Sequence, residues 1–157
     1  MTDASLTSRL GARVLRTRWI VRAPILLYRA GLGFVFGSRL LMLQHTGRRS
    51  GAPRFVVLEI VDNPAPGEYV IVSGFGVTAQ WYRNIQADPR VRLWTGFRRG
   101  VPATATPMSD PESATALNHY VQQHPQAWDK LRGTIEQATG KPVDTLPMVA
   151  LHIDTPR

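Results

Sequence analysis

Short apolar stretches alternate with turn-forming residues through the middle of the chain, at a spacing too close for long helices. Stretches rich in β-branched and aliphatic residues, bounded by glycine, proline and asparagine, are typical of strands. Turn signals are strongest over residues 63–67 and 96–100. The pattern predicts strands over residues 39–45, 55–61, 69–72, 91–94 and 101–106, with a short helix inserted over residues 79–87.

The last third of the chain changes to a helical pattern. Ser109 and Glu112 form a capping box, because the serine hydroxyl and the glutamate three residues later satisfy each other's backbone N–H groups. Pro125 is expected to open a second helix and Gly140 to end it. A final apolar stretch over residues 148–153 predicts one more strand.

Residues 1–22 predict a basic amphipathic helical arm. Apolar residues recur at helical spacing, and arginines line another side of the same helix: Leu6, Leu10, Val14 and Val21 against Arg9, Arg13 and Arg16. This pattern fits a helix lying on a membrane surface, and it equally fits a helix packed on its own domain. The longest uncharged run nearby covers only residues 30–38, whereas a spanning helix needs roughly 20 apolar residues.

The order of these elements defines a fold class. The strands do not alternate with long helices, which disfavours a doubly wound parallel sheet. We expect a mainly β, α+β protein: a small antiparallel barrel with helices outside, preceded by the helical arm and carrying a C-terminal helix pair. The 157 residues suit one such domain, which we place at residues 23–157.

Charge and cysteine content narrow the possible functions. The chain has no cysteine, which excludes a disulfide framework, a Cys-ligated metal and a cysteine nucleophile. The net charge is +8, and residues 1–54 hold ten arginines against one acid, so an anionic partner should meet the protein there. Nucleic acid is not expected, because the strands are apolar throughout. A cytoplasmic location is expected, with peripheral membrane contact through the arm as an option.

Three groups of residues carry candidate chemistry. The first is the segment 46–54, in which two glycines and three arginines surround a turn suited to anion binding; the alternative is a solvated hairpin tip. The second is the small-residue segment 73–76 at the end of a predicted strand. A flat ring could lie against its backbone; the alternative is a plain β-to-α turn. The third is the pair Trp81 and Asn84, which share one helix face. They could form the wall of a pocket; the alternative is a tryptophan in the core beside an asparagine whose amide is hydrogen-bonded.

Together, the motifs T-G-R-R-S-G-x-P-R, S-G-F-G and W-Y-R-N-I-x-A-D-P resemble the deazaflavin-dependent nitroreductase family of actinobacteria. The resemblance covers residues 24–106 and implies a split β-barrel, FMN-binding-like in fold, that uses coenzyme F420. It implies that the coenzyme's phosphodiester and oligoglutamate tail would be held by the turn residues Arg48, Arg49, Ser50, Gly51, Pro53 and Arg54. The deazaflavin ring would be bordered by Val57, Glu59, Gly74, Phe75, Gly76, Trp81 and Asn84.

Two departures from the family pattern concern the acceptor. Phe75 stands where nitro-reducing members carry a lysine, and Glu59 stands where they carry a tyrosine, which speaks against nitroreduction. The resemblance therefore implies hydride transfer from reduced F420 to an electron-poor quinone, enone or lipid-like molecule, with Glu59 as candidate proton donor. We expect the acceptor pocket between barrel, arm and helix pair, near Phe34, Phe36, Tyr120 and Trp128.

Other functions remain open at this point. A non-catalytic protein of the same fold that binds lipid, fatty acid or a membrane surface is the main alternative. FMN is a less favoured cofactor, because the sequence distinguishes poorly between the two rings. No metal is expected, since the four histidines have no metal-ligand spacing.

Overall fold

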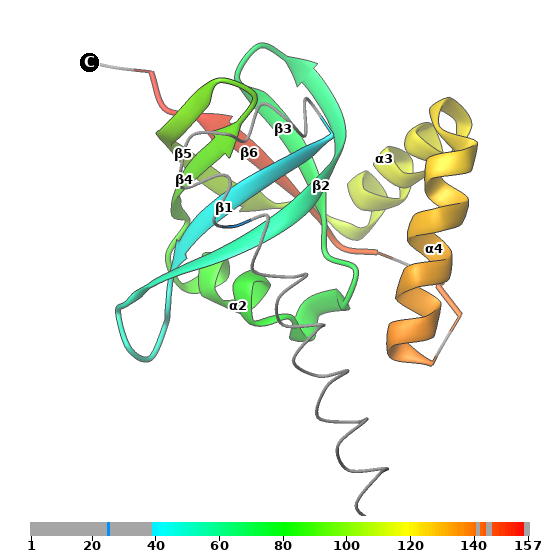
Figure 1. Ribbon diagram of the computed structural model, residues 1–157, viewed down its shortest axis with the longest axis horizontal. Helices are drawn as coiled ribbons and strands as arrows, with labels where there is room; N and C mark the ends of the chain where they lie inside the picture. Colours follow the sequence, from blue (N-terminus) through cyan, green and yellow to red (C-terminus); the bar gives the residue numbers. More distant parts are fainter. Residues whose placement is uncertain (1–24, 26–38, 141, 144–145, 156–157) are drawn as a thin grey trace, which may run out of the picture.

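A computed structural model describes residue 25 and residues 39–140, 142–143 and 146–155 (Figure 1). The predicted arm over residues 1–22, together with Phe34 and Phe36, lies outside the described residues. The elements follow in the order β1 (Leu40–Thr46), β2 (Pro53–Ala65), β3 (Glu68–Val72), the 3-10 turn η2 (Gly76–Thr78), α2 (Gln80–Ala87), β4 (Arg90–Thr95), β5 (Arg98–Pro107), α3 (Asp110–Gln123), α4 (Pro125–Thr139) and β6 (Met148–Ile153).

The six strands close into one antiparallel barrel in the order β1-β2-β3-β6-β5-β4. β1 pairs with β2 over its whole length and closes the barrel on its other edge against β4, where Leu43 lies opposite Leu93. β6, from the C-terminal end of the chain, fits between β3 and β5. Closure gives every strand two partners, so the barrel has no free edge. The predicted α+β split barrel is confirmed.

Two apolar cores explain why the strands are apolar on both faces. Alternate residues such as Leu41, Leu43 and Ile71 fill the barrel interior. The residues between them on β3 and β6, including Val70, Val72 and Met148, point outward into a second core. α3 and α4 cover that outer face (Figure 1). The helix pair is therefore part of the same folding unit as the barrel.

Helix α2 closes one end of the barrel. Trp81, Tyr82 and Ile85 enter the interior core, and the remaining surface of this short helix is polar. α3 begins at the predicted capping box, in which Ser109 Oγ accepts from the Glu112 N–H and Glu112 Oε2 accepts from the Ser109 N–H. α4 begins at Pro125 and ends at Gly140 in the left-handed conformation, as expected.

Two predicted boundaries are wrong. β2 continues to Ala65, into the expected turn at residues 63–67, and only residues 66–67 form the turn; its pairing with β3 has register shifts between Ile60 and Asp62 and between Asp62 and Ala65. β5 begins at Arg98, inside the expected 96–100 turn. In both places a partner strand supplies ladder hydrogen bonds that outweigh the local turn preference. Among the described residues, no helix has the length and apolar character needed to cross a membrane.

Candidate functional site

The arginine-bearing turn between β1 and β2 is tightly built. The Gly47 N–H donates to Ala52 O at 2.9 Å, and the Gly51 N–H donates to Gly47 O at 2.8 Å. A side chain on Gly47 would meet Ser50 Oγ at 2.7 Å, so Ser50 would have to shift from the position in which it accepts from the Ala52 N–H. Gly51 has a φ of 69°, which favours glycine as well. The two glycines thus set a compact loop whose tip carries the arginines.

Arg48 is hydrogen-bonded to the buried side-chain amide of Asn84. Asn84 Oδ1 on α2 accepts from the Arg48 backbone N–H at 3.2 Å and from its Nη1 at 2.9 Å. Asn84 is only 5% exposed and its Nδ2 lies 3.1 Å from Nδ1 of His45, which is also 5% exposed. Burial and the nearby charge of Arg54 lower the pKa of His45 to about 4. A buried polar chain therefore connects the strand, the helix and the arginine turn.

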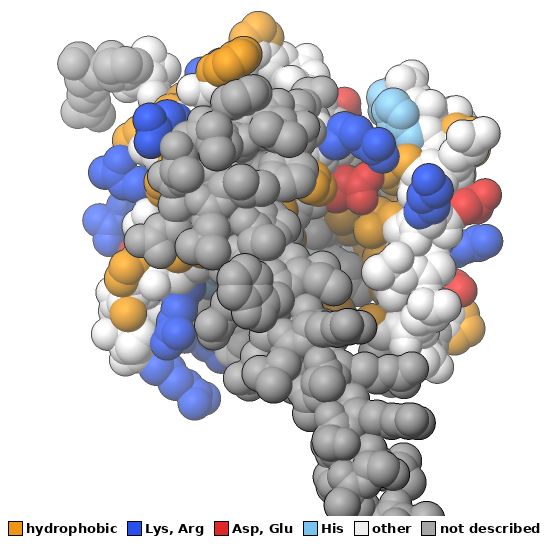
Figure 2. All heavy atoms as spheres, in the orientation of Figure 1, with side chains coloured by type: hydrophobic (Ala, Val, Ile, Leu, Met, Phe, Trp, Pro, Cys, Tyr) orange, Lys and Arg blue, Asp and Glu red, His pale blue; other side chains and the backbone are white. Residues whose placement is uncertain are grey.

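The other turn residues predicted to bind an anion lie at the surface. Arg49, Ser50, Pro53 and Arg54 are exposed, and Ser50 Oγ accepts from the Ala52 N–H at 3.2 Å. Figure 2 shows basic side chains gathered at the edge of the molecule where the β1–β2 hairpin ends. The three guanidinium groups are thus on a solvent-facing tip, with Arg48 alone anchored through Asn84.

Two of the residues expected beside a ring share the outer face of β2. Val56, Leu58 and Ile60 pack on the barrel interior. Because strand side chains alternate, Val57 and Glu59 point outward, and both are half-buried. The structure therefore places them together, on the face that leads from the arginine turn toward α3.

The glycine-rich exit 73–76 has a packing role that the sequence did not reveal. The space that a side chain on Gly74 would occupy is filled by Ile135 of α4, at 3.2 Å. Ser73 is buried and its Oγ donates to Gly76 O at 2.6 Å, while Gly76 has a φ of 73°. Phe75 is 61% exposed. The exit is thus a hydrogen-bonded turn against α4 that presents Phe75 to solvent.

Trp81 and Asn84 do not form the mixed apolar and polar pocket wall that their spacing suggests. Trp81 is buried in the barrel core, edge-on to Tyr82. Asn84 has its amide occupied by Arg48 and His45. The alternative interpretation, a core tryptophan with a satisfied amide, describes their placement, and Asn84 contributes to the site through Arg48.

Tyr120 and Glu59 form a polar pair between α3 and β2. The Tyr120 hydroxyl donates to Glu59 Oε1 at 2.6 Å, and the tyrosine is only 3% exposed. Burial raises the pKa of Tyr120 far above its ordinary value, the contact with Glu59 raises it further, and the charge of Arg39 opposes the shift. Figure 2 shows acidic and basic side chains side by side in the hollow between the barrel and the helix pair.

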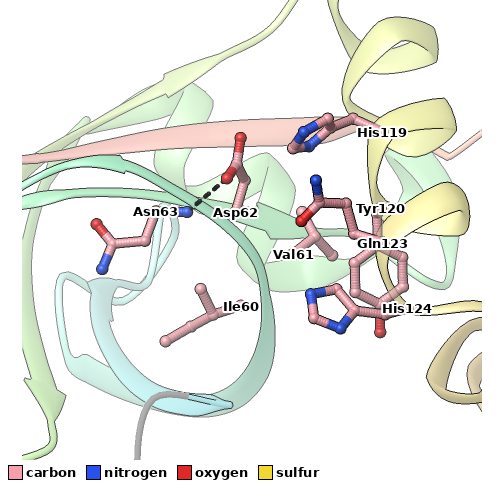
Figure 3. Close-up of a pocket in the computed structure, with 8 residues that line it drawn as sticks. All are labelled: Ile60, Val61, Asp62, Asn63, His119, Tyr120, Gln123 and His124. Carbon is pink, nitrogen blue, oxygen red and sulfur yellow. Dashed lines mark hydrogen bonds between the residues drawn. The ribbon is translucent and has the colours of Figure 1, made fainter.

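A cavity of about 280 Å³ lies between the far part of β2 and α3 (Figure 3). Its walls come from two segments and are mostly polar: Ile60, Val61, Asp62 and Asn63 on one side, His119, Tyr120, Gln123 and His124 on the other. The ring of His124 lies 5.5 Å from that of Tyr120, centre to centre. Tyr120 therefore belongs both to the cavity and to the Glu59 pair. Of the predicted acceptor residues, Trp128 packs instead in the second core.

His45 is the site residue that sequence reasoning missed. From the sequence, the four histidines are considered only as metal ligands, yet His45 lies on the same strand face as Leu41 and Leu43, which are fully buried. The period of two along β1 could have identified it as a titratable group facing inward. Among the described residues, no cluster of three or more His, Asp or Glu could hold a metal.

Solved structures with this architecture place the fold in a known class. One described as a domain-swapped dimer has a TM-score of 0.55 at 21% identity, covering 87% of this chain and 99% of that chain. An F420-H2 dependent reductase has a TM-score of 0.50 at 22% identity, covering 73% and 94%. HutZ, a heme storage protein from Vibrio cholerae, has a TM-score of 0.53 at 14% identity, covering 78% and 87%. The protein is thus a split β-barrel.

The family model for F420H(2)-dependent quinone reductases matches residues 27–143. The chain belongs to that family, and the protein is an F420-dependent oxidoreductase whose cofactor is coenzyme F420. A comparison with curated proteins gives no match. The family expected from the arginine turn and the tryptophan helix is confirmed.

Proposed function

We propose that the protein reduces a quinone with reduced F420, binding the coenzyme tail at the β1–β2 turn and the acceptor in the cavity between β2 and α3. The family description supports a quinone as the acceptor. The observation that carries the proposal is the arrangement along β2: the arginine turn lies at the start of the strand, Glu59 lies on its outer face, and the cavity residue Asp62 lies near its end.

The donor set of the turn fits a polyanionic coenzyme. Arg48, Arg49 and Arg54 present guanidinium groups that pair with phosphate or carboxylate oxygens in a forked geometry. A guanidinium has five N–H donors, so Arg48 keeps several free of its Asn84 contact. When bound, F420 supplies a hydride, and the protein supplies position and electrostatics.

The cavity offers the donors that a quinone carbonyl needs. His119, Gln123 and His124 carry N–H groups, and apolar atoms of Ile60 and Val61 line the opposite wall. Its volume of about 280 Å³ is near the lower end of ligand pockets, which suits the ring system of a quinone rather than a long chain. A longer apolar tail would extend outside the cavity.

The Glu59–Tyr120 pair would supply the proton that the reduced quinone needs. A quinone that accepts a hydride becomes a hydroquinone only after one oxygen takes up a proton. We assign the delivery to Glu59 in its protonated form: Oε1 accepts from the Tyr120 hydroxyl at 2.6 Å, Oε2 would give up the proton, and solvent would then reprotonate the carboxylate. Glu59→Gln should lower turnover with menadione and flatten its pH profile, whereas unchanged turnover across pH would remove Glu59 from the mechanism.

The decisive experiment is a fluorescence titration with F420 beside one with FMN, followed by turnover with menadione. Arg48→Ala combined with Arg49→Ala should weaken F420 binding strongly, and less so at high salt, because screening reduces the contribution that is lost. The matched control is Arg98→Ala with Arg99→Ala, which removes the same charge at the β4–β5 turn, at the other end of the barrel.

Three results would count against the proposal. Equal weakening by both double variants would mean that net charge, not the turn, binds the coenzyme. Absence of F420 binding by the native protein would refute the cofactor site. F420 binding without menadione turnover, together with sedimentation on anionic liposomes, would favour the lipid-binding alternative.

A further inference from the structure

The orientation of the Asn84 amide follows from its partners. Both Arg48 groups that face it, the backbone N–H and Nη1, are donors only, so the atom that they contact must be the amide oxygen. The other atom is then the NH2 group, which lies 3.1 Å from His45 Nδ1 and can only donate. His45 Nδ1 must therefore be an unprotonated acceptor, and the ring carries its proton on Nε2.

We propose that His45 is a positioning residue for the coenzyme site, holding the Asn84 amide in the one orientation that fixes Arg48 toward the bound polyanion. The inference rests on the proposed function, since it concerns the coenzyme tail. The two hydrogen bonds from Arg48 to Asn84 Oδ1 hold both its backbone and its guanidinium. A flipped amide would point its NH2 group at these donors and lose both bonds.

The surroundings of His45 keep its ring neutral, as an acceptor at Nδ1 requires. Arg54 lies opposite it on β2, Arg48 lies in the turn above it, and α2 offers only the neutral Asn84 amide. Among the described residues, these two charged neighbours are cations, and the ring is buried, so protonation of His45 is disfavoured. At neutral pH the histidine is thus a fixed acceptor rather than a switch.

A fixed Arg48 binds an anion better than a free one. An arginine side chain loses rotamer entropy when it is ordered, and here the hydrogen-bonded chain His45–Asn84–Arg48 orders it before the ligand arrives. This ordering affects binding of the coenzyme and leaves the hydride step unaffected. The expected signature is therefore a change in KM for F420 with an unchanged kcat at saturation.

A double-mutant cycle tests the role of His45. His45→Phe keeps a ring but removes the acceptor, and should raise the Kd and KM for F420 about fivefold to tenfold. His45→Asn, which offers a carbonyl oxygen near the position of Nδ1, should restore most of the affinity. In an Asn84→Asp background both side-chain oxygens of residue 84 can accept from Arg48, so the orientation of that side chain no longer matters. Adding His45→Phe to this background should leave the Kd for F420 unchanged within twofold.

The outcomes separate this inference from the proposed function. If His45→Phe weakens F420 binding equally in both backgrounds, His45 acts through packing and the positioning role is refuted. If the native protein does not bind F420, the proposed function fails, and nitrogen NMR of the native protein decides the inference alone. The inference is supported if His45 carries its proton on Nε2 and if the Arg48 guanidinium protons exchange slowly in the native protein but rapidly in His45→Phe. A proton on Nδ1 of His45 overturns the inference.

Discussion

Lowering the pH from 7 to 4.5 should reduce the free energy of unfolding by about 2.5 kcal/mol through His45 alone. Burial and the charge of Arg54 lower the pKa of His45 to about 4, whereas the ordinary pKa of 6.5 applies to the unfolded chain. The unfolded state therefore binds more protons. The contribution of His45 to stability is complete above pH 6.5, decreases as the pH falls, and is lost below pH 4.

The magnitude follows from the pKa difference. Each pH unit between the two pKa values changes the free energy of unfolding by about 1.4 kcal/mol, so the complete titration costs about 3.5 kcal/mol. This is an upper value, because His45 is only 5% exposed and solvent screening can only reduce the effect. For a domain of this size, such a loss is a substantial fraction of a total stability of about 5–15 kcal/mol.

Urea unfolding at pH 7 and pH 4.5 measures the effect, with His45→Phe as the matched variant. Asp88 also destabilises the protein on acidification, since its contact with Arg90 lowers the pKa of Asp88, but it is present in both proteins and cancels in the difference. The native protein should lose about 2.5 kcal/mol more than the variant. Parallel losses in both proteins would refute the assignment of His45 as a buried, neutral group.

Three further substitutions test separate contacts by urea unfolding at pH 7. Tyr120→Phe should cost about 1–2 kcal/mol, because Glu59 Oε1 loses its 2.6 Å partner; an unchanged midpoint would mean that water replaces the hydroxyl fully. Ser109→Ala should cost about 1 kcal/mol by removing the cap of α3, and equal loss from Thr115→Ala, within the helix, would contradict this reason. Gly47→Ala should cost about 1–2 kcal/mol through its 2.7 Å approach to Ser50, whereas Gly133→Ala, with open space around it, should be neutral or stabilising.

The strands and caps could be predicted because their signals are local. The apolar run that predicts a strand over residues 39–45 and the capping box at Ser109 depend on residues within one element, and the structure has β1 at Leu40–Thr46 and the capping box at Ser109. The boundary of β2 could not be predicted, because Pro64 lies in a strand only through its pairing with β3. Ladder closure between β1 and β4 likewise joins segments about 50 residues apart, which no local pattern specifies.

The arginine turn and the tryptophan helix were identified as a site, but the physical link between them was not. The turn was recognised from its three arginines, and α2 from Trp81 and Asn84. The sequence suggested that the tryptophan and the amide face a ligand together. The structure instead buries the tryptophan and turns the amide to Arg48, because α2 must close the end of the barrel. Only the folded barrel brings residue 84 within hydrogen-bond distance of residues 45 and 48.

The two halves of the proposed site are supported by different elements, and this division affects how the protein can change. α2 anchors the arginine turn through Asn84, while α3 supplies Tyr120, His119 and the rest of one cavity wall. β2 is the element common to both, with Arg54 near its start and Asp62 near its end. Substitutions on the exposed positions of α3 therefore reshape the cavity without touching any contact of the turn. If the proposed site is correct, acceptor preference could change while coenzyme binding is kept, because the cavity residues would not hold the polyanion.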